Sequence, residues 1–393
     1  MSKEAWILDG ARTPLCRYTG HFSNVSAIEL GAVASRGALQ RAGVDPSHID
    51  HVVIGNAQQT SPDAIYGARH VGLKAGVREE TPALTVNRLC GSGIQSIIEA
   101  AHLLRLGEAD VVLAGGMENM TQAPHVIYGA RQGFPLGGGK MQDSLTLALL
   151  DPYCGCTMSQ TSDNLARKYG ISREAQDEYA LLSQQRAAAA AERGVFTEEI
   201  VPVEVRTRKG TVEVAADDHM RPQTTLEGLA KLEPSFGPDS FVTAGNASGI
   251  VDGAAAVVVA GPEWAREHRK EPLGKVVSWG VIGVDPSYMG IGPVPASKLA
   301  LERAGWRLED VDLVEVNEAF AGQYLAVESE LGLDRERTNV NGGAIALGHP
   351  LGATGTRIVY TLLKELHRRG GGRGLATACI GGGQGIAMCL QVG

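Results

Sequence analysis

The sequence lacks the features that would suit a strongly anionic partner. Aromatic residues make up only 5% of its 393 residues, and 36 Lys and Arg are outnumbered by 44 Asp and Glu, for a formal net charge of −8. No run of basic residues interleaved with aromatics occurs, which argues against nucleic acid and against an anionic membrane surface as partners. Uninterrupted apolar runs of about 18 residues, which a membrane span needs, are also missing. The first residues contain neither an apolar signal core nor an Arg-rich presequence, so we expect a cytoplasmic protein.

Cysteine is scarce, and its spacing argues against two further classes. The six cysteines are too far apart for a secreted disulfide scaffold, so we expect reduced thiols. Cys90, Cys379 and His349 belong to no C-x-x-C or H-x-x-x-H element, and Cys154 and Cys156 form an isolated C-x-C, which argues against a metal site. The glycine-rich stretches match neither a phosphate-binding P-loop nor a dinucleotide-binding fingerprint. We therefore predict no metal and no cofactor of these classes.

Glycine, in contrast, is abundant, with 51 residues, and it clusters between segments of alternating character. Apolar residues recur with helical spacing over 94–104, and a long polar helix is expected over about 173–193. Short apolar runs typical of buried strands occur at 51–54, 83–86, 111–114, 313–316 and 375–379. Alternation of strand and helix predicts an α/β fold with layers.

An internal repeat indicates that the two ends of the chain are duplicated halves. Residues 38–57 align without a gap on 300–319, and each copy reads helix, Ala-Gly stop, loop and strand. A second, weaker repeat is also present. The order strand, Asn87, loop and helix in the first half matches the order strand, Asn341, loop and helix in the second. We predict a first half over 1–120, completed by about 249–271, and a second half over 272–393. The loop-rich region 121–248 between them is expected to be an inserted subdomain.

Cys90 is the first candidate for chemistry. It follows the predicted strand 83–86 and stands at the start of an amphipathic helix, where the helix dipole would lower its pKa and favour the thiolate. The N–H groups of the neighbouring glycines could face a developing oxyanion. A lone cysteine is more often a small buried residue, but its position at a helix start favours a nucleophile.

Three more residues lie at strand ends or in glycine-framed loops. His349, within Gly-His-Pro, could activate a thiol and polarise a carbonyl, although a structural histidine is an equal alternative. Cys379 ends a predicted strand against the turn 381–383, and Asn317 follows the repeated strand of the second half, where its amide could hold a water or a carbonyl. If the loops after strands of both halves converge, these residues share one site.

With these motifs the sequence resembles the thiolase family along the whole chain. The matching segments are Asn-Arg-Leu-Cys-Gly-Ser-Gly (87–93), Ala-Gly-Asn-Ala-Ser-Gly (244–249), Asn-Glu-Ala-Phe (317–320), Gly-His-Pro (348–350) and Cys-Ile-Gly-Gly-Gly (379–383). The resemblance implies the thiolase fold, with duplicated halves in five layers α-β-α-β-α. Ketoacyl synthases, which share the nucleophilic cysteine, lack the Cys379 segment.

The resemblance also implies a two-step acyl exchange on coenzyme A. Cys90 would carry the acyl group, and Cys379 would act as general acid and base. His349 would take the proton of Cys90 and, aided by a water held on Asn317, would donate a hydrogen bond to the thioester oxygen of the substrate. Backbone N–H groups of Cys90 and Gly381 would form a second oxyanion site. Acetyl-CoA, 3-ketoacyl-CoA and coenzyme A are then substrates, and no cofactor is required.

Further positions carried over from the family concern substrate binding. Ser248 would lie near the pantetheine and Arg221 near the adenine, while Met289 and Phe320 would line the acyl pocket. Met158 and Ala244 complete the predicted binding residues.

One departure bears on the substrate. Biosynthetic acetoacetyl-CoA thiolases carry a His-Met pair that narrows the acyl pocket, whereas this sequence has Thr157 and Met158 there. Residues 63–73 and 285–290 are most similar to the mitochondrial-type 3-ketoacyl-CoA branch. Degradative thiolysis is therefore expected, with acetoacetyl-CoA formation from two acetyl-CoA as the alternative and an inactive CoA-binding protein as a remote one. The resemblance further implies a homodimer or a homotetramer, the latter through the loop near 125–140.

Overall fold

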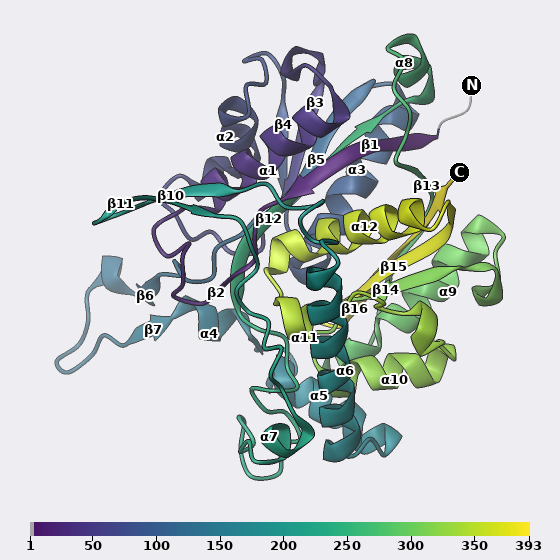
Figure 1. Cartoon of the computed structure of the whole chain (residues 1–393). Coiled ribbons are helices and arrows are strands. Elements are labelled where there is room, and N and C mark those ends of the chain that lie inside the picture. The colour runs from purple at the N-terminus through teal and green to yellow at the C-terminus, as the bar shows by residue number, and fades with distance from the viewer. Residues whose placement is uncertain (1–3) are drawn as a thin grey trace.

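The computed structural model describes residues 4–393, which are organised around a mixed ten-stranded sheet (Figure 1). Its order is β14-β15-β16-β13-β1-β12-β5-β3-β4, with β2 paired to β12. The first half contributes β1 (Ala5–Arg12), β2 (Cys16–Arg17), β3 (His51–Gly55), β4 (Ala83–Val86), β5 (Val111–Glu118) and β12 (Val251–Ala260). The second half contributes β13 (Gly274–Gly283), β14 (Leu313–Val316), β15 (Gly372–Ile380) and β16 (Gln384–Val392). Among the described residues, the strands of the two halves pair with each other only where Ala5, Trp6 and Ile7 of β1 meet β13.

Five layers result from the way the helices cover these strands. Two helices, α3 (Ser92–Leu106) and α12 (Leu351–Arg368), pack on each other between the halves. On the outer face of the first half lie α1 (Ala27–Ala42) and α2 (Gly67–Lys74), and on that of the second lie α9 (Pro293–Ala304) and α10 (Ala321–Leu331). The predicted α-β-α-β-α arrangement is therefore confirmed. Because α3 and α12 touch apolar faces on both sides, they are buried over most of their surface.

The internal repeat is visible in the structure. Helix α1 ends at Gly43 and α9 ends at Gly305, with φ of 60° and 67°. In this left-handed conformation glycine carries no Cβ penalty, which explains the repeated Ala-Gly stop. Each helix is followed by a 3₁₀ helix, η1 (Pro46–His48) or η6 (Leu308–Asp310), and then by the predicted strand, β3 or β14.

The second, weaker repeat is only partly present in the structure. The strand predicted before Asn341 is absent from the described residues, where only Thr338 forms a single parallel bridge with Val314. Asn339 has a φ of 48°, and its side chain accepts from the Val316 N–H and donates to the Val316 carbonyl. An amide side chain thus replaces the backbone bonds of a strand.

The region 121–248 has many short elements. It contains β6 (His125–Ile127), η4 (Ala130–Gln132), β7 (Met141–Asp143), α4 (Ser144–Ala148), β8 (Leu150–Asp151), β9 (Cys156–Thr157), α5 (Met158–Tyr169), α6 (Arg173–Glu192), β10 (Val203–Thr207), β11 (Gly210–Val214) and α7 (Leu226–Ala230). The remaining elements are η2 (Ala64–Tyr66), η3 (Leu89–Gly91), α8 (Pro262–Glu267), η5 (Pro286–Ile291), η7 (Arg335–Arg337) and α11 (Ala344–Leu347). The long polar helix forms as α6, as predicted, whereas the domain boundaries themselves stay a prediction.

Residues 4–393 lack two features, a membrane-spanning helix and a cluster of metal-binding side chains. No helix in that range is long and apolar enough to cross a membrane. No group of three or more His, Cys, Asp and Glu side chains in it is placed to hold a metal ion.

Candidate active site

The four predicted catalytic side chains come from loops that end parallel strands or begin buried helices. Cys90 lies in η3, between β4 and α3, and Asn317 directly follows β14. Cys379 is near the end of β15, and His349 lies just before α12. Because β3 pairs in parallel with β4, and β14 with β15, the carboxyl ends of these strands open toward one edge in each half.

Cys90 is a neutral thiol in this structure. The pKa of Cys90 is raised to about 11, chiefly by burial and also by the charge of Glu118, although the backbone N–H groups of Gly381 and Cys90 itself act to lower it. The predicted lowering of this pKa is therefore wrong. The physical reason is that α3 begins only at Ser92, so Cys90 lies in the tight turn before it, where desolvation outweighs the nearby N–H dipoles. A general base is needed to make the thiolate.

His349 has the protonation state that such a base requires. Burial, and to a lesser degree the charge of Arg357, lower the pKa of His349 to about 3, so its imidazole is neutral. The Thr354 hydroxyl donates to the Pro350 carbonyl at 3.0 Å, and its oxygen lies 2.6 Å from His349 Nδ1. We therefore assign the Nδ1–H tautomer, which leaves Nε2 as an acceptor.

The unprotonated Nε2 atom of His349 faces Asn317. The Asn317 Nδ2 atom lies 3.4 Å from His349 Nε2, and Asn317 Oδ1 is buried without a protein partner. A buried amide oxygen in this situation normally binds a water molecule. This geometry agrees with the expectation of a water held on Asn317.

Cys379 is buried next to Cys90. Burial, together with the charge that Cys90 would carry, raises the pKa of Cys379 well above its usual range. Cys379 packs in an apolar cluster with Met289, and Met158 and Phe320 pack against that cluster. Both thiols are free, as the sequence analysis predicted.

A cavity of about 200 Å³ opens beside His349. Its walls include four of the predicted residues, Met158, Ser248, Phe320 and His349, whereas Met289 lies behind them against Cys379. Sequence reasoning missed several of its other walls, which come from α4 and its C-terminal end, the start of α12 and distant loops: Met120, Thr146, Leu149, Phe236, Ile250 and Leu351. No motif marks these residues, and only the fold brings them together.

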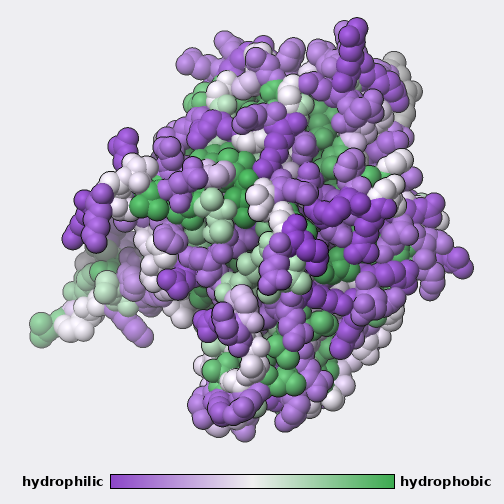
Figure 2. Space-filling model, in the orientation of Figure 1, coloured by the Kyte–Doolittle hydropathy of each residue, from purple (hydrophilic) through white to green (hydrophobic). Residues whose placement is uncertain are grey.

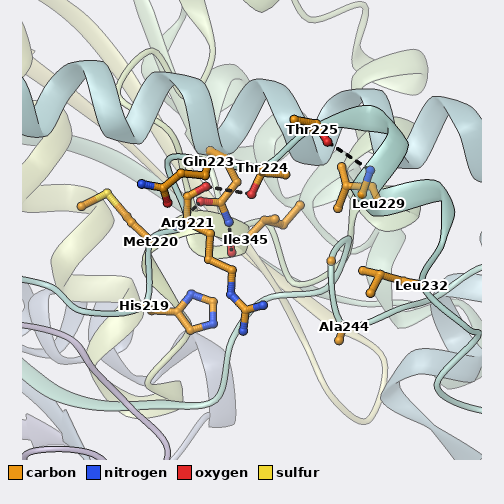
Figure 3. A pocket seen from close by; sticks show the side chains of 13 residues that line it. His219, Met220, Arg221, Gln223, Thr224, Thr225, Leu229, Leu232, Ala244 and Ile345 are labelled. Carbon is orange, nitrogen blue, oxygen red and sulfur yellow. Dashed lines mark hydrogen bonds between the residues drawn. The ribbon is translucent and has the colours of Figure 1, made fainter.

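A second cavity, of about 420 Å³, contains the other two predicted binding residues, Arg221 and Ala244 (Figure 3). His219 lies beside Arg221, and burial followed by the Arg221 charge lowers the pKa of His219. The segment 244–250 connects the two cavities, because Ala244 and Gly245 line the outer one and residues 247–250 line the inner one. The arrangement suits a long ligand whose polar end lies outside and whose reactive end reaches His349.

Comparison with known proteins agrees with this geometry. A model of the thiolase N-terminal domain matches residues 5–263, and one of the thiolase C-terminal domain matches residues 270–392. The chain belongs to the thiolase family. This thiolase is 52% identical over 387 residues to human mitochondrial 3-ketoacyl-CoA thiolase, and 47% identical over 387 residues to an acetyl-CoA acetyltransferase of Cupriavidus necator. Each alignment covers 98% of both chains.

Solved structures give the same assignment. The crystal structure of human mitochondrial 3-ketoacyl-CoA thiolase superposes with a TM-score of 0.98 at 52% identity and covers 99% of each chain. The same enzyme in complex with CoA superposes with a TM-score of 0.97 at 51% identity, over 99% of this chain and 98% of the other. The predicted family, fold and enzyme class, an acyltransferase, are confirmed.

Proposed function

We propose that this thiolase cleaves 3-ketoacyl-CoA with coenzyme A into acetyl-CoA and an acyl-CoA shortened by two carbons. The observation that carries the proposal is the neutral His349, which lines the inner cavity. The walls of that cavity also pack on both free thiols, through Phe320 on the cluster of Cys379 and through Leu351 on the cluster of Cys90. A base, a nucleophile and a second acid are thereby available without a metal or a bound cofactor.

In the first step His349 takes the proton of Cys90, and the thiolate attacks the C3 carbonyl of the substrate. The C2–C3 bond then breaks, which leaves an acyl thioester on Cys90 and the enolate of acetyl-CoA. Cys379 donates its proton to C2 of the enolate, and acetyl-CoA leaves. The Gly381 N–H, which already donates to the Cys90 sulfur, is suited to the oxyanion formed at C3.

In the second step a new CoA thiol gives its proton to the Cys379 thiolate and attacks the thioester. The acyl group passes to CoA, and the proton held on His349 returns to Cys90. Every proton is thus returned, and the same steps in reverse form a carbon–carbon bond by Claisen condensation.

The two cavities provide the binding sites in this proposal. Arg221 and Ala244 would hold the nucleotide end of coenzyme A in the outer cavity, and Ser248 would lie along the pantetheine. Met158 and Phe320 would contact the acyl chain, with Met289 behind them.

Thr157 supports the degradative direction over acetoacetyl-CoA synthesis. Its side chain lines the inner cavity at the N-cap of α5, where it is smaller than the histidine of biosynthetic relatives. The alternative, an acetyl-CoA acetyltransferase that joins two acetyl-CoA, is supported by the Cupriavidus necator relative of that name. A protein that only binds CoA would not need the four catalytic side chains.

The quaternary structure is also part of the proposal. The arm that carries β6 and β7 projects from the body and exposes apolar side chains, visible as the patch at the lower left of Figure 2. Leu136 is fully exposed there, and Tyr128 and Met141 are largely exposed. Exposed apolar surface of this kind is typical of interfaces, which supports a homotetramer built from dimers. The cytoplasmic location stays a prediction.

Thiolysis of acetoacetyl-CoA and of a medium-chain 3-ketoacyl-CoA, measured in parallel with Cys90→Ala as blank, tests the activity. We expect kcat/KM for the longer substrate to equal or exceed that for acetoacetyl-CoA. A strict preference for acetoacetyl-CoA would instead assign the chain as an acetyl-CoA acetyltransferase.

A further inference from the structure

Glu118 is a buried carboxylate close to the nucleophile to which the mechanism above gives no role. It is the last residue of β5 and has no exposed surface. Burying an ionised carboxylate is costly unless hydrogen bonds compensate it. The position of Glu118 therefore requires an explanation.

Four uncharged N–H groups converge on this carboxylate. Oε1 accepts from Asn56 Nδ2 at 2.9 Å and from the Gln58 N–H at 3.0 Å. Oε2 accepts from the Ala57 N–H at 3.0 Å and from the Gly352 N–H at 2.8 Å. A protonated carboxyl group would direct its O–H toward one of these donors, so the site is built for the anion.

The ionisation of Glu118 reflects a balance. The pKa of Glu118 is raised to about 7, because burial, together with the charge of Asp252 on β12, outweighs the lowering effect of the three backbone N–H groups. Above neutral pH the carboxylate is therefore charged, and Cys90 is the thiol exposed to its field.

The four donors come from both halves of the molecule. Residues 56–58 form the loop after β3, whereas Gly352 belongs to the first turn of α12, three residues after His349. β5 and the start of α12 can approach closely because Gly116 has no Cβ. A Cβ at this position of β5 would overlap the Gly352 carbonyl. Glu118 thus connects the loop 56–58 of the first half to the start of α12 in the second half, which directly follows His349.

Cys90 lies against the same loop and helix. Ala57 and Cys90 both pack on one apolar cluster, which contains Leu351, the neighbour of Gly352. The Asn87 side chain, in the loop of the nucleophile, donates to the Ala57 carbonyl at 3.0 Å. Displacement of the residues bound to Glu118 would therefore shift the distance between nucleophile and base.

We propose that Glu118 is a positioning residue of the acyl-transfer reaction, which fixes the start of α12, and with it His349, against the loop beside Cys90. Its negative charge further opposes ionisation of Cys90, which packs on the same apolar cluster as Ala57, whose N–H Glu118 binds. The inference rests on the proposed role of Cys90, and it predicts two separable effects, one of geometry and one of charge.

Two variants separate these effects. Glu118→Asp keeps the charge but shortens the side chain, so kcat should fall about tenfold to a hundredfold through misplacement, with little change in the KM for CoA. Glu118→Gln removes the charge and places an amide against two donors. It should lower kcat similarly and also shift the pH profile of Cys90 alkylation by iodoacetamide down by about one pH unit. The control Asp252→Asn removes another buried carboxylate that does not bond to α12. Removal of its charge lowers the pKa of Glu118, so Glu118 stays ionised above neutral pH and the alkylation profile there should remain that of the unmodified enzyme.

Alkylation is read by peptide mass spectrometry at Cys90, so it requires no turnover and remains informative if the catalytic assignment fails. If Glu118→Gln leaves both kcat and the alkylation profile unchanged, the proposal is wrong. A variant that does not fold is replaced by Glu118→Asp, for which an unchanged kcat would equally overturn it. Loss of the role proposed for Cys90 would be seen separately, as full activity of Cys90→Ala.

Discussion

Burial, more than any single neighbour, sets the protonation states of the catalytic residues. It raises the pKa of Cys90 and Cys379 and lowers that of His349, so all three are neutral at rest. Neutral groups are cheaper to bury than an ion pair, which is consistent with a site enclosed between the two halves. Proton transfer from Cys90 to His349 must therefore coincide with substrate attack, when charge moves onto the substrate oxygen.

The neutral His349 predicts how acid affects stability. Its pKa is about 3 when folded against about 6.5 in an unfolded chain, so below pH 6.5 the unfolded state binds a proton that the folded state does not. The contribution of His349 to stability is therefore complete above pH 6.5 and declines as the pH falls toward 3. His349→Asn should lose about 2 kcal/mol less free energy of unfolding than the original enzyme between pH 7 and pH 5.

Urea unfolding at the two pH values measures this difference. Glu118 and Glu315, whose pKa values burial raises, have the opposite pH dependence, but they are common to both proteins and cancel in the comparison. An equal loss of stability in variant and original enzyme would mean that His349 is protonated in the folded state.

At the residue scale the sequence identified the chemical groups but not their environment. Cys90, His349 and Cys379 were found from glycine-framed motifs and from the resemblance, because these patterns are local. The raised pKa of Cys90 could not be predicted, since it depends on burial by the second half of the chain. Phe236 and Leu149 were missed because no motif marks them and only the fold brings them to the cavity.

At the scale of elements, the start of α5 joins local structure to substrate choice. Thr157 caps the helix in a capping box with Gln160, and it also lines the acyl cavity. The sequence pattern Thr-x-x-Gln is a known helix-start signal, so the cap is predictable from local sequence, whereas the expected role of Thr157 in the pocket came from the family resemblance.

Replacement of Thr157 tests this double role. Thr157→His should lower kcat/KM for a medium-chain substrate about tenfold relative to acetoacetyl-CoA, because the ring fills the cavity. Thr157→Ala is the matched control: it loses the cap, at a cost of about 1 kcal/mol, without narrowing the cavity. Equal selectivity in the two variants would exclude Thr157 as a determinant of chain length.

Contact between β5 and the start of α12 predicts a second effect at this scale. Gly116→Ala should destabilise the fold by about 3 kcal/mol, since its Cβ meets backbone that has no room to move. Gly107→Ala is the control, because it has open space around it and only its φ of 73° is unfavourable, which costs about 1 kcal/mol. Urea unfolding compares the two, and a smaller loss for Gly116→Ala would show that α12 can shift away from β5.

The repeat shows where prediction of elements succeeds and where it fails. The strands and glycine stops of 38–57 and 300–319 follow from apolar runs and from Gly43 and Gly305, which are local signals. The strand expected before Asn341 does not form because the Asn339 side chain bonds to β14 in its place. A tertiary hydrogen bond of this kind leaves no trace in hydrophobic periodicity.

At the scale of the whole molecule, the projecting arm exposes apolar side chains in the isolated chain, among them Leu136. If it forms the interface between dimers, Leu136→Asp should convert a tetramer to dimers in size-exclusion chromatography with light scattering, while kcat is retained. Leu106→Asp, an exposed leucine at the end of α3, is the control and should not change the mass. A tetramer that persists in Leu136→Asp would place the interface elsewhere.

The central claim is that acyl groups pass through Cys90 in a site completed by both halves of the chain. The most direct measurement is peptide mass spectrometry of the protein after incubation with acetyl-CoA and rapid acid quenching. We predict one acetyl group per chain on Cys90, removed by added CoA and absent from Cys90→Ala. Acetylation of another residue, or full thiolysis activity without any acetyl group on Cys90, would contradict the account.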